Sequence, residues 1–527
     1  MNRKLLFAIV IGMMTIGQIH AQFKKYLYVD SMYPRSSVSR TNNIQYATNT
    51  GVITGSPKLE NLKLDLYQPT SNASTSRPLV IFMHTGSYLP RYINGTPTGA
   101  RDDSATVEYC TQIAQRGYVV ASISYRLGWN PFDTTEDGRK SGIINAAYKS
   151  VQDLASAIRF FKKSVATGNA YGIDSNKIAL GGQGTGSYVV YAFSALTAQS
   201  DIRIAKFYDF TKKAWMVQDS LLWGDRFGFR IPGSAGILVV ENSKGYTSNA
   251  HAGFAFGGAM GDSGWMKPGQ IPLTSVHSVK DPFAPYLTDY VLTPPPFNQV
   301  VVKVSGGHDV MVRENRLGNN KIYADSSKNW GDVYSKNART MLSPEKIEGL
   351  YPIHGRANSS GPWEWWADSV TLVNWLADPS KHPGDTFSLT QAKIIYSNGI
   401  KANPLMSKTR ALKYIDTSLG YTMPRIACAL GLWNCGADYQ VNAVKNLDYS
   451  ANVTVAPVPS DGRIQIWHNL MNNKIQGIEI FDINGRTQYK YGSQGNSTAL
   501  NLELKPGVYF MNIEFTSGKA VKKFVIQ

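Results

Sequence analysis

The sequence predicts an α/β protein whose larger, first part is a doubly wound, mostly parallel sheet and whose last part is a small all-β unit. Between Leu62 and about Ala259, apolar strand-like runs alternate with segments of helical periodicity, as in repeated strand–helix units. From residue 453 onward the pattern changes to short alternating segments separated by turn residues. That change predicts an antiparallel, immunoglobulin-like sandwich.

The strands and helices of the first part follow from their periodicity. The continuous apolar run LVIFM is typical of a strand buried on both faces of a parallel sheet. Further strands are predicted at 62–66, 118–124, 177–180, 252–256, 273–276 and 299–304. Apolar residues at helical spacing predict helices at 107–116, 146–163 and 188–198. The second of these ends in Lys162 and Lys163, which suit the negative end of a helix dipole.

The N-terminus has the composition of a secretory signal peptide. Arg3 and Lys4 precede a short apolar core, and Ala21 marks a cleavage site. No later stretch is apolar for long enough to cross a bilayer. We therefore expect export and no transmembrane segment.

Composition changes along the chain predict its domains. Residues 1–21 are the signal peptide and 22–435 the α/β domain, within which the polar and aromatic stretch at about 199–250 is interpreted as an insertion. Such insertions cover the carboxyl ends of strands, where ligands bind, so we expect a lid. A polar linker spans 436–452, and the sandwich spans 453–527.

Charge and cysteines limit the partners. The formal net charge is +17, which favours acidic partners such as anionic polysaccharide or lipopolysaccharide. The basic residues are scattered and form no nucleic-acid motif, and no His/Cys cluster has zinc spacing. We therefore expect no nucleic acid, metal or cofactor.

Export permits a disulfide between Cys428 and Cys435 if the geometry of the short loop allows it, and Cys110 is predicted to be a buried apolar residue.

The glycine-rich stretch LGGQGTGSY lies between a predicted strand and a predicted helix. Gly182 and Gly186 stand where the pattern G-x-S-x-G has its glycines, and Gly184 stands where it has the nucleophile. A Cβ on either flanking residue would clash in such a turn, so we expect the turn to persist. Gly184 tolerates a strained backbone but offers no attacking atom. Replacement by Thr185, whose side chain should point elsewhere, or by Ser187, nearly one helical turn deeper, is disfavoured.

Five segments resemble, in order, landmarks of the α/β-hydrolase superfamily, in particular its secreted esterase and lipase-like branch in Bacteroidota. They are LKLDLYQP (62–69), LVIFMHTGSY (79–88), GYVVASISYRLGWN (117–130), DSNKIALGGQGTGSY (174–188) and IPLTSVHSVKDPFAPY (271–286). The second resembles a strand followed by an oxyanion loop, the fourth a strand leading into a nucleophile elbow, and the fifth a strand whose end carries the catalytic acid. The resemblance implies an α/β-hydrolase fold.

The resemblance also implies roles for single residues. Asp281 matches the acid, although an aspartate before Pro282 also suits a simple turn. His308 is the preferred base and His354 the second candidate, and the third alternative is that neither pairs with Asp281. The implied oxyanion and binding residues, which a hydrogen-bonded loop would equally explain, are His84, Thr85, Gly86, Ser87 and Thr185.

The last 75 residues resemble a type A C-terminal sorting domain of the type IX secretion system. The matching segments are PVPSDGRIQI (457–466), IEIFDINGR (478–486), LKPGVYFMNI (504–513) and KAVKKFVI (519–526). The resemblance implies passage through the type IX machinery and removal of the domain by its sortase. The protein would then be released or attached to anionic lipopolysaccharide at the cell surface.

Two functions fit these patterns. The first is a secreted protein resembling carboxylesterases and lipases that is weakly active or inactive, because Gly184 replaces the nucleophile. The alternative is a non-catalytic binding or structural protein of the cell surface, which uses the retained cleft for a small acyl or glycan ligand or uses its basic surface. Whether the protein is an enzyme stays open at this point.

Overall fold

The computed structural model describes residues 25–527 except 54, 71–75, 294–297, 325–329, 356–360, 366–368, 379–386, 436–446, 471–473, 496 and 516–517. The predicted signal peptide and most of the predicted linker lie outside the described residues. No helix within the described part is long and apolar enough to cross a membrane.

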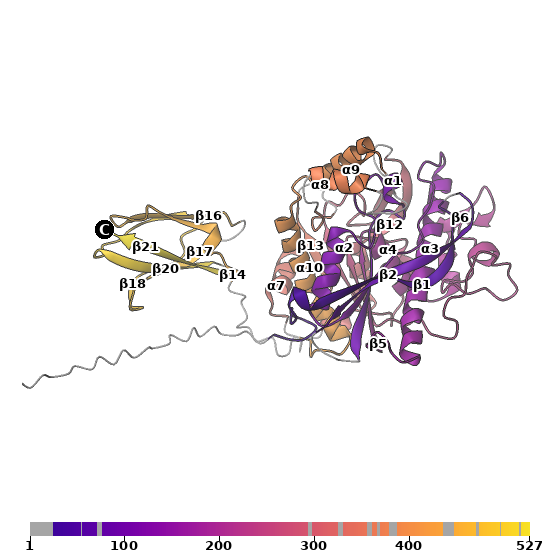
Figure 1. The fold of residues 1–527 in the computed structure, drawn as a ribbon, viewed down its shortest axis with the longest axis horizontal. Helices are drawn as coiled ribbons and strands as arrows, with labels where there is room; N and C mark the ends of the chain where they lie inside the picture. Colours follow the sequence, from indigo (N-terminus) through magenta and orange to yellow (C-terminus); the bar gives the residue numbers. More distant parts are fainter. Residues whose placement is uncertain are drawn as a thin grey trace, which may run out of the picture.

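Eight strands of the described chain form the central sheet, in the order β1-β2-β4-β3-β5-β8-β10-β13 (Figure 1). β1 pairs with β2, and β2 with β4, in antiparallel fashion, whereas the remaining neighbours are parallel. The predicted mostly parallel sheet is confirmed. Its strands are β1 (Val38–Gly51), β2 (Lys58–Pro69), β3 (Arg77–Met83), β4 (Val119–Ile123), β5 (Ile173–Gln183), β8 (Ala252–Phe256), β10 (Leu273–Ser278) and β13 (Leu350–Ile353).

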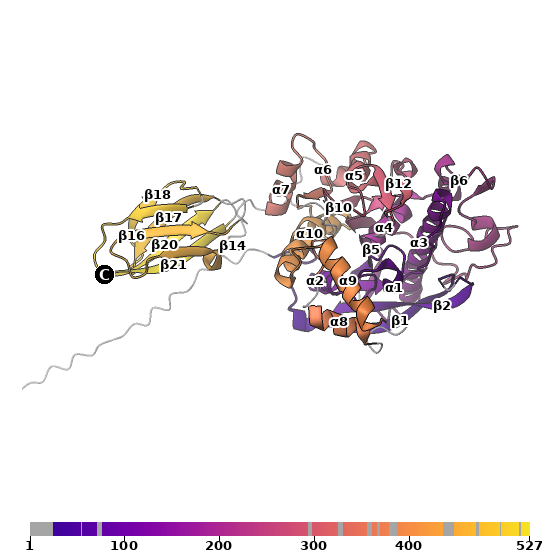
Figure 2. The ribbon, with the colours of Figure 1, turned by 90° about the horizontal axis from the view of Figure 1, so that it is seen from above.

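Helices cover both faces of the sheet (Figure 2). α3 (Glu136–Ala166) and α4 (Thr185–Ala195) pack in one apolar core with Leu79 and Ile81 of β3, whereas α2 (Ser104–Ala114) and α10 (Lys408–Ala429) pack in a second core with the alternate residues of that strand. This is the doubly wound arrangement that a strand buried on both faces predicts. The other helices are α1 (Arg91–Asn94), α5 (Gly307–Arg316), α6 (Lys321–Ala324), α7 (Val333–Met341), α8 (Ser369–Ala377) and α9 (Leu389–Ala402).

α3 begins ten residues before the predicted start. The Thr135 hydroxyl accepts a hydrogen bond from the Gly138 N–H at 3.0 Å, and Glu136 and Asp137 stand in the first turn. An N-cap threonine and early acids both stabilise a helix start. This local signal outweighs the lack of apolar periodicity in that turn.

The strand predicted at 299–304 exists but belongs to a different sheet. β12 (Val300–Gly306) pairs in antiparallel fashion with β11 (Asp289–Leu292) and β9 (Ala259–Met260). The eighth position of the central sheet is taken by β13 instead. Periodicity identifies a strand, but partner choice depends on contacts that are distant in the sequence.

The stretch predicted as an insertion is largely irregular, with two short strands, β6 (Tyr208–Asp209) and β7 (Ala214–Trp215). Its second half lies along α3 and β1. The Gln152 side-chain amide donates to Trp223 O at 2.7 Å, and the Asn242 side-chain amide donates to Thr48 O at 2.9 Å. This half is held firmly against the domain, and the first half contributes to the cavity described below.

The C-terminal region is all-β, as predicted. Its strands alternate buried and exposed residues and enclose a separate apolar core that includes Ile464, Ile480 and Met511. One sheet has the order β14-β21-β20-β17-β18 and the other β15-β16-β19. The strands are β14 (Leu447–Asp448), β15 (Val453–Ala456), β16 (Arg463–His468), β17 (Ile475–Asp482), β18 (Thr487–Tyr491), β19 (Ser497–Asn501), β20 (Gly507–Phe515) and β21 (Gly518–Ile526).

The cysteine predictions are confirmed. Cys428 and Cys435 form a disulfide at the end of α10. Cys110 is a free, fully buried residue of α2. Burial raises the pKa of its thiol far above the ordinary value, so it behaves as an apolar core residue.

Candidate active-site cavity

The glycine turn forms a sharp link between β5 and α4. Gly184 has φ 52° and ψ −116°, and its N–H donates to Phe256 O at 2.9 Å. An L-residue is strained at this φ, whereas glycine is not. The structure therefore contains the elbow-shaped turn at the carboxyl edge of the sheet, without a side chain at its tip.

The two flanking glycines are required by close backbone packing. A Cβ on Gly182 would lie 2.3 Å from the carbonyl carbon of Gly186, and a Cβ on Gly186 would lie 2.2 Å from Met83 O. Both positions are closer than real Cβ contacts. The predicted reason for these glycines is confirmed.

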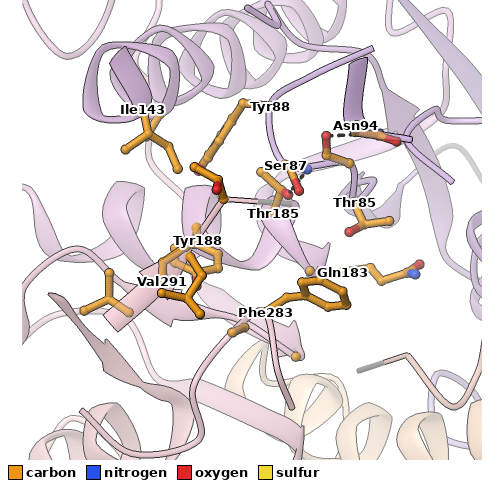
Figure 3. A pocket seen from close by; sticks show the side chains of 18 of the residues that line it. Thr85, Ser87, Tyr88, Asn94, Ile143, Gln183, Thr185, Tyr188, Phe283 and Val291 are labelled. Atoms are coloured by element: carbon orange, nitrogen blue, oxygen red, sulfur yellow. Dashed lines mark hydrogen bonds between the residues drawn. The ribbon is translucent and has the colours of Figure 1, made fainter. Parts of the chain in front are cut away.

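Thr85, in the loop after β3, fills the space beside Gly184. A Cβ placed on Gly184 would lie 2.1 Å from Thr85 Oγ1 and 2.9 Å from Thr85 Cβ. Figure 3 shows Thr85 and Thr185 in the same wall of the cavity, above Gln183. A side chain at 184 would therefore overlap Thr85 unless the threonine moved.

The loop at 84–87, predicted to bind an oxyanion, is held by internal hydrogen bonds. The Ser87 N–H donates to Thr185 Oγ1 at 2.6 Å, and the Trp129 indole N–H donates to Ser87 O at 2.8 Å. Gly86 has φ 126°, and a Cβ there would lie 2.6 Å from the Cα of Gly99. One backbone donor of the loop is thus already occupied by a protein hydroxyl.

His84 serves the structure of this loop. It is buried and stacks on Tyr125, whose hydroxyl donates to His84 O at 2.8 Å. Its Nδ1 lies 2.6 Å from Thr85 O, so this nitrogen carries the proton and donates. Burial lowers the pKa of His84 to about 4, and the ring is neutral at neutral pH.

Ser187 is the buried link between β5, α4 and β8. Its hydroxyl donates to Gly182 O at 2.7 Å and accepts from the Phe256 N–H at 3.0 Å. Both partners are backbone groups of the sheet, and the side chain is fully buried. Ser187 does not face the cavity as a nucleophile would.

Removing the Ser187 hydroxyl is expected to lower the free energy of unfolding and to have no other effect. Ser187→Ala leaves a buried carbonyl and a buried N–H without their partner, which costs about 1–3 kcal/mol. Chemical denaturation followed by circular dichroism measures the change. An unaltered free energy of unfolding would contradict this role, and Ser263→Ala, on the short helical turn after β9, provides a matched control.

Asp281 follows β10 and borders the cavity. Its Oδ1 accepts from the Phe283 N–H at 2.8 Å and the Ala284 N–H at 3.0 Å, and its side chain is 3% exposed. It is thus a turn former that also borders the cavity, and its role as a catalytic acid stays a prediction. Burial raises its pKa to about 7.

Among the described residues, His277 is the imidazole that lies within 4 Å of Asp281. Its Nε2 lies 3.8 Å from Asp281 Oδ2 but only 2.9 Å from Ala284 O, to which it donates. Burial lowers the pKa of His277 to about 4. The ring is therefore neutral, and its Nε2–H group donates to the backbone carbonyl of Ala284.

The structure places the two predicted histidines elsewhere. His308, at the start of α5, has Nδ1 2.9 Å from Asp309 Oδ1 and Nε2 3.1 Å from Glu345 Oε2. His354 follows β13, the parallel neighbour of β10, and is exposed. Among the described residues, no hydrogen bond or ion pair joins either one to Asp281, and neither borders the cavity. Their catalytic roles stay predictions.

A cavity of about 810 Å³ opens at the elbow and has two chemically different ends (Figure 3). The apolar arm is lined from α3, α4, the insertion and β12. The residues that define it are Ile143, Val151, Tyr188, Ala192, Ile202, Phe207, Val217 and Val302. The polar end is defined by Thr85, Asn94, Gln183, Gly184, Asp281 and Glu364.

Three residues of the polar end, Asn94, Gln183 and Glu364, were not identified from the sequence. The Gln183 side-chain amide donates to Glu364 Oε1 at 2.9 Å. Burial raises the pKa of Glu364 to about 8. Glu364 lies in the segment GPWEWW, and the tryptophans of this segment are the feature by which the sequence could have drawn attention to it. Trp363 is 1% exposed and contacts Tyr109 and Phe256, so it packs in the core at the cavity wall, while Trp366 lies outside the described residues.

The sheet order, the elbow and the cavity at its edge define an α/β-hydrolase-fold protein. Residues 64–219 match the BD-FAE family model, an esterase-like α/β-hydrolase domain, and residues 454–527 match the secretion system C-terminal sorting domain. The chain therefore contains a segment that resembles the esterase-like α/β-hydrolases, and it carries a sorting domain for type IX export to the cell surface or the medium. No curated protein matches the sequence significantly.

Solved structures similar to this chain include esterases of the Planctomycetes species Thermogutta terrifontis. Its esterase 2 with bound propionate is 14% identical over 69% of this chain and 94% of that chain, with a TM-score of 0.31. The native form is 14% identical over 71% and 95%, also with a TM-score of 0.31. The form phosphorylated by paraoxon is 16% identical over 48% and 75%, with a TM-score of 0.27.

Proposed function

We propose that this protein is an exported, non-hydrolytic relative of esterases that binds a ligand with a long apolar chain in the elbow cavity. The observation that carries the proposal is the fit of Thr85 against Gly184. The threonine hydroxyl stands 2.1 Å from where a nucleophile's Cβ would be. A site that had merely lost its serine would leave that space open.

Three further features support the absence of hydrolysis. The Ser87 N–H, a candidate oxyanion donor, is bound to Thr185 Oγ1. The one imidazole that the described part of the chain places within 4 Å of Asp281 is the neutral His277, at 3.8 Å. Ser187 is engaged with backbone groups. Acyl transfer needs a nucleophile, a base that activates it and free donors for the oxyanion.

The cavity itself supports ligand binding. A large apolar concavity with a few polar groups at one end is the usual form of a small-molecule site. The apolar arm lies between α3, α4 and the first half of the insertion, and all its defining residues are apolar or aromatic. This shape suits an acyl or alkyl chain better than a glycan, which needs polar groups along its length.

Turnover of nitrophenyl butyrate tests the chemistry. We expect no rate above background in the wild type, because removal of the nucleophile from a serine hydrolase typically costs about 10⁶ in turnover. Gly184→Ser combined with Thr85→Gly is expected to remain inactive as well, since no imidazole is hydrogen-bonded to Asp281 among the described residues. The Thr85→Val variant tests whether the Thr85 hydroxyl contributes to any turnover. Wild-type turnover that Thr85→Val abolishes would refute the proposal.

Calorimetric titration with decanol tests the binding. We expect saturable binding, weakened tenfold or more by Ala192→Phe, because a phenyl group at 192 fills the apolar arm. Ala146→Ser, on the buried side of α3 and outside the cavity lining, is the matched control. Decanol binding that Ala192→Phe leaves unchanged would place the ligand outside this cavity.

A further inference from the structure

The polar end of the cavity contains two carboxyl groups that pair with no cation among the residues the structure describes. Asp281 and Glu364 both border the cavity. Among the described residues, neither forms an ion pair with a lysine or arginine. Arg91, which follows the loop at 84–87, is already paired with Asp103 at 2.6 Å and Asp102 at 3.2 Å. Lys401 also borders the cavity, but its side chain is exposed and pairs with neither carboxyl.

Among the described residues, some polar atoms at this end have no protein partner. Asp281 Oδ1 accepts two backbone hydrogen bonds, whereas no described residue donates to Oδ2, which lies 3.8 Å from Nε2 of the neutral His277. Gln183 is 1% exposed, and its Oε1 is buried without a hydrogen-bond partner. Figure 3 shows the Gln183 side chain extending past Thr85 and Phe283 at this end of the cavity. Buried polar atoms normally have hydrogen-bond partners, so we expect a ligand to supply a donor to these two oxygens.

The unpartnered groups lie close to one another. A Cβ placed on Gly257 would lie 3.5 Å from Asp281 Oδ2 and 3.5 Å from two ring carbons of Trp363, so these two side chains are neighbours. Glu364 is next in the chain and accepts from Gln183. The group therefore forms one acceptor-rich, aromatic-lined corner at the end of an apolar arm.

We propose that this corner, formed by Gln183, Asp281 and Glu364 beside Trp363, binds the cationic amine head group of the ligand. The inference rests on the proposed function, because the apolar arm holds the chain of the same molecule. An alkylammonium group carries three N–H donors and one positive charge, which matches acceptors that have no donor and carboxyls that have no cation. The ligand class is therefore an amine-bearing amphiphile.

Burial is consistent with this assignment. It raises the pKa of Asp281 to about 7 and that of Glu364 to about 8, because a carboxylate is costly in an apolar site without a counter-ion. Asp103, itself paired with Arg91, also raises the pKa of Glu364 slightly. A bound ammonium ion would supply the missing charge. An anionic head group would instead meet two carboxyls and be repelled.

Three probes of equal chain length test the head-group preference on the full chain by calorimetry at pH 8. They are decylammonium chloride, decanol and sodium decanoate. We expect decylammonium to bind at least tenfold more tightly than decanol and decanoate to bind most weakly. Equal affinities for the amine and the alcohol, or a preference for decanoate, would overturn the inference while leaving the apolar-chain proposal intact. If none of the three binds, the proposed function itself fails.

Isosteric variants assign the preference to residues. Asp281→Asn combined with Glu364→Gln is expected to reduce the amine-to-alcohol affinity ratio to about one. Glu136→Gln, which removes an exposed carboxylate at the start of α3, is expected to retain the wild-type ratio. A preference that survives in the double variant would refute the assigned corner. The wild-type comparison of probes stands even if the double variant does not fold.

Discussion

Gly184→Ser is expected to lower the free energy of unfolding by several kcal/mol, and Thr85→Gly in the same chain to return part of that loss. The serine Cβ would overlap Thr85 Oγ1, and overpacking of this kind costs about 1–3 kcal/mol. The strained φ of 52° adds about 1–3 kcal/mol for any L-residue. Only the overpacking cost depends on Thr85, whereas the backbone strain does not.

A double-mutant cycle separates the two costs. The free energies of unfolding of the wild type, both single variants and the double variant give a coupling energy, expected at about 1–3 kcal/mol and favourable in the double variant. Gly184→Ala with the same Thr85→Gly change is the matched control, because the clash involves Cβ rather than the hydroxyl. Additive effects would show that Thr85 does not fill the nucleophile's place.

Asp281→Asn is expected to remove a pH-dependent loss of stability. The pKa of Asp281 is raised to about 7 by burial, whereas an aspartate in the unfolded chain titrates near 3.9. The folded protein therefore binds the additional proton between these values, and its stability falls as the pH rises. The contribution is fully present below about pH 4 and is lost by about pH 7.

Denaturation curves at pH 5 and pH 8 measure this effect. From the pKa of about 7, the wild type should lose about 3 kcal/mol relative to Asp281→Asn over this interval. Asp133→Asn is the control, since hydrogen bonds from the Thr135 N–H and hydroxyl lower the pKa of Asp133. Its carboxyl is ionised in both the folded and the unfolded chain across this interval, so the variant should keep the wild-type dependence on pH. A parallel pH dependence of wild type and Asp281→Asn would exclude a buried, protonated Asp281.

Some features of the fold could be predicted because they depend on residues close together in the chain. The run LVIFM identified β3, and the glycines at 182 and 186 identified a tight strand-to-helix turn. The spacing of Cys428 and Cys435 made a disulfide conceivable. In each case the determining contact lies within a few residues or within one repeating period.

Other features could not be predicted, because they depend on contacts between residues that are far apart in the chain. The strand at 299–304 was recognised, but its partners β9 and β11 were not, since strand pairing depends on distant segments. His308 was matched to Asp281 by analogy, but folding brings it to Asp309 and Glu345. Gln183 and Glu364 are 181 residues apart and became a pair only through packing.

The sequence by itself determined that position 184, in the tight turn between β5 and α4, has no side-chain atom in any conformation, because it is a glycine. Only the tertiary structure decided what surrounds that position. Thr85 fills the space beside Gly184, the Ser87 N–H donates to the Thr185 hydroxyl, and two carboxyls beside an apolar cavity have no cation among the described residues. These arrangements depend on the packing of loops that follow different strands, and such packing is set by the whole domain.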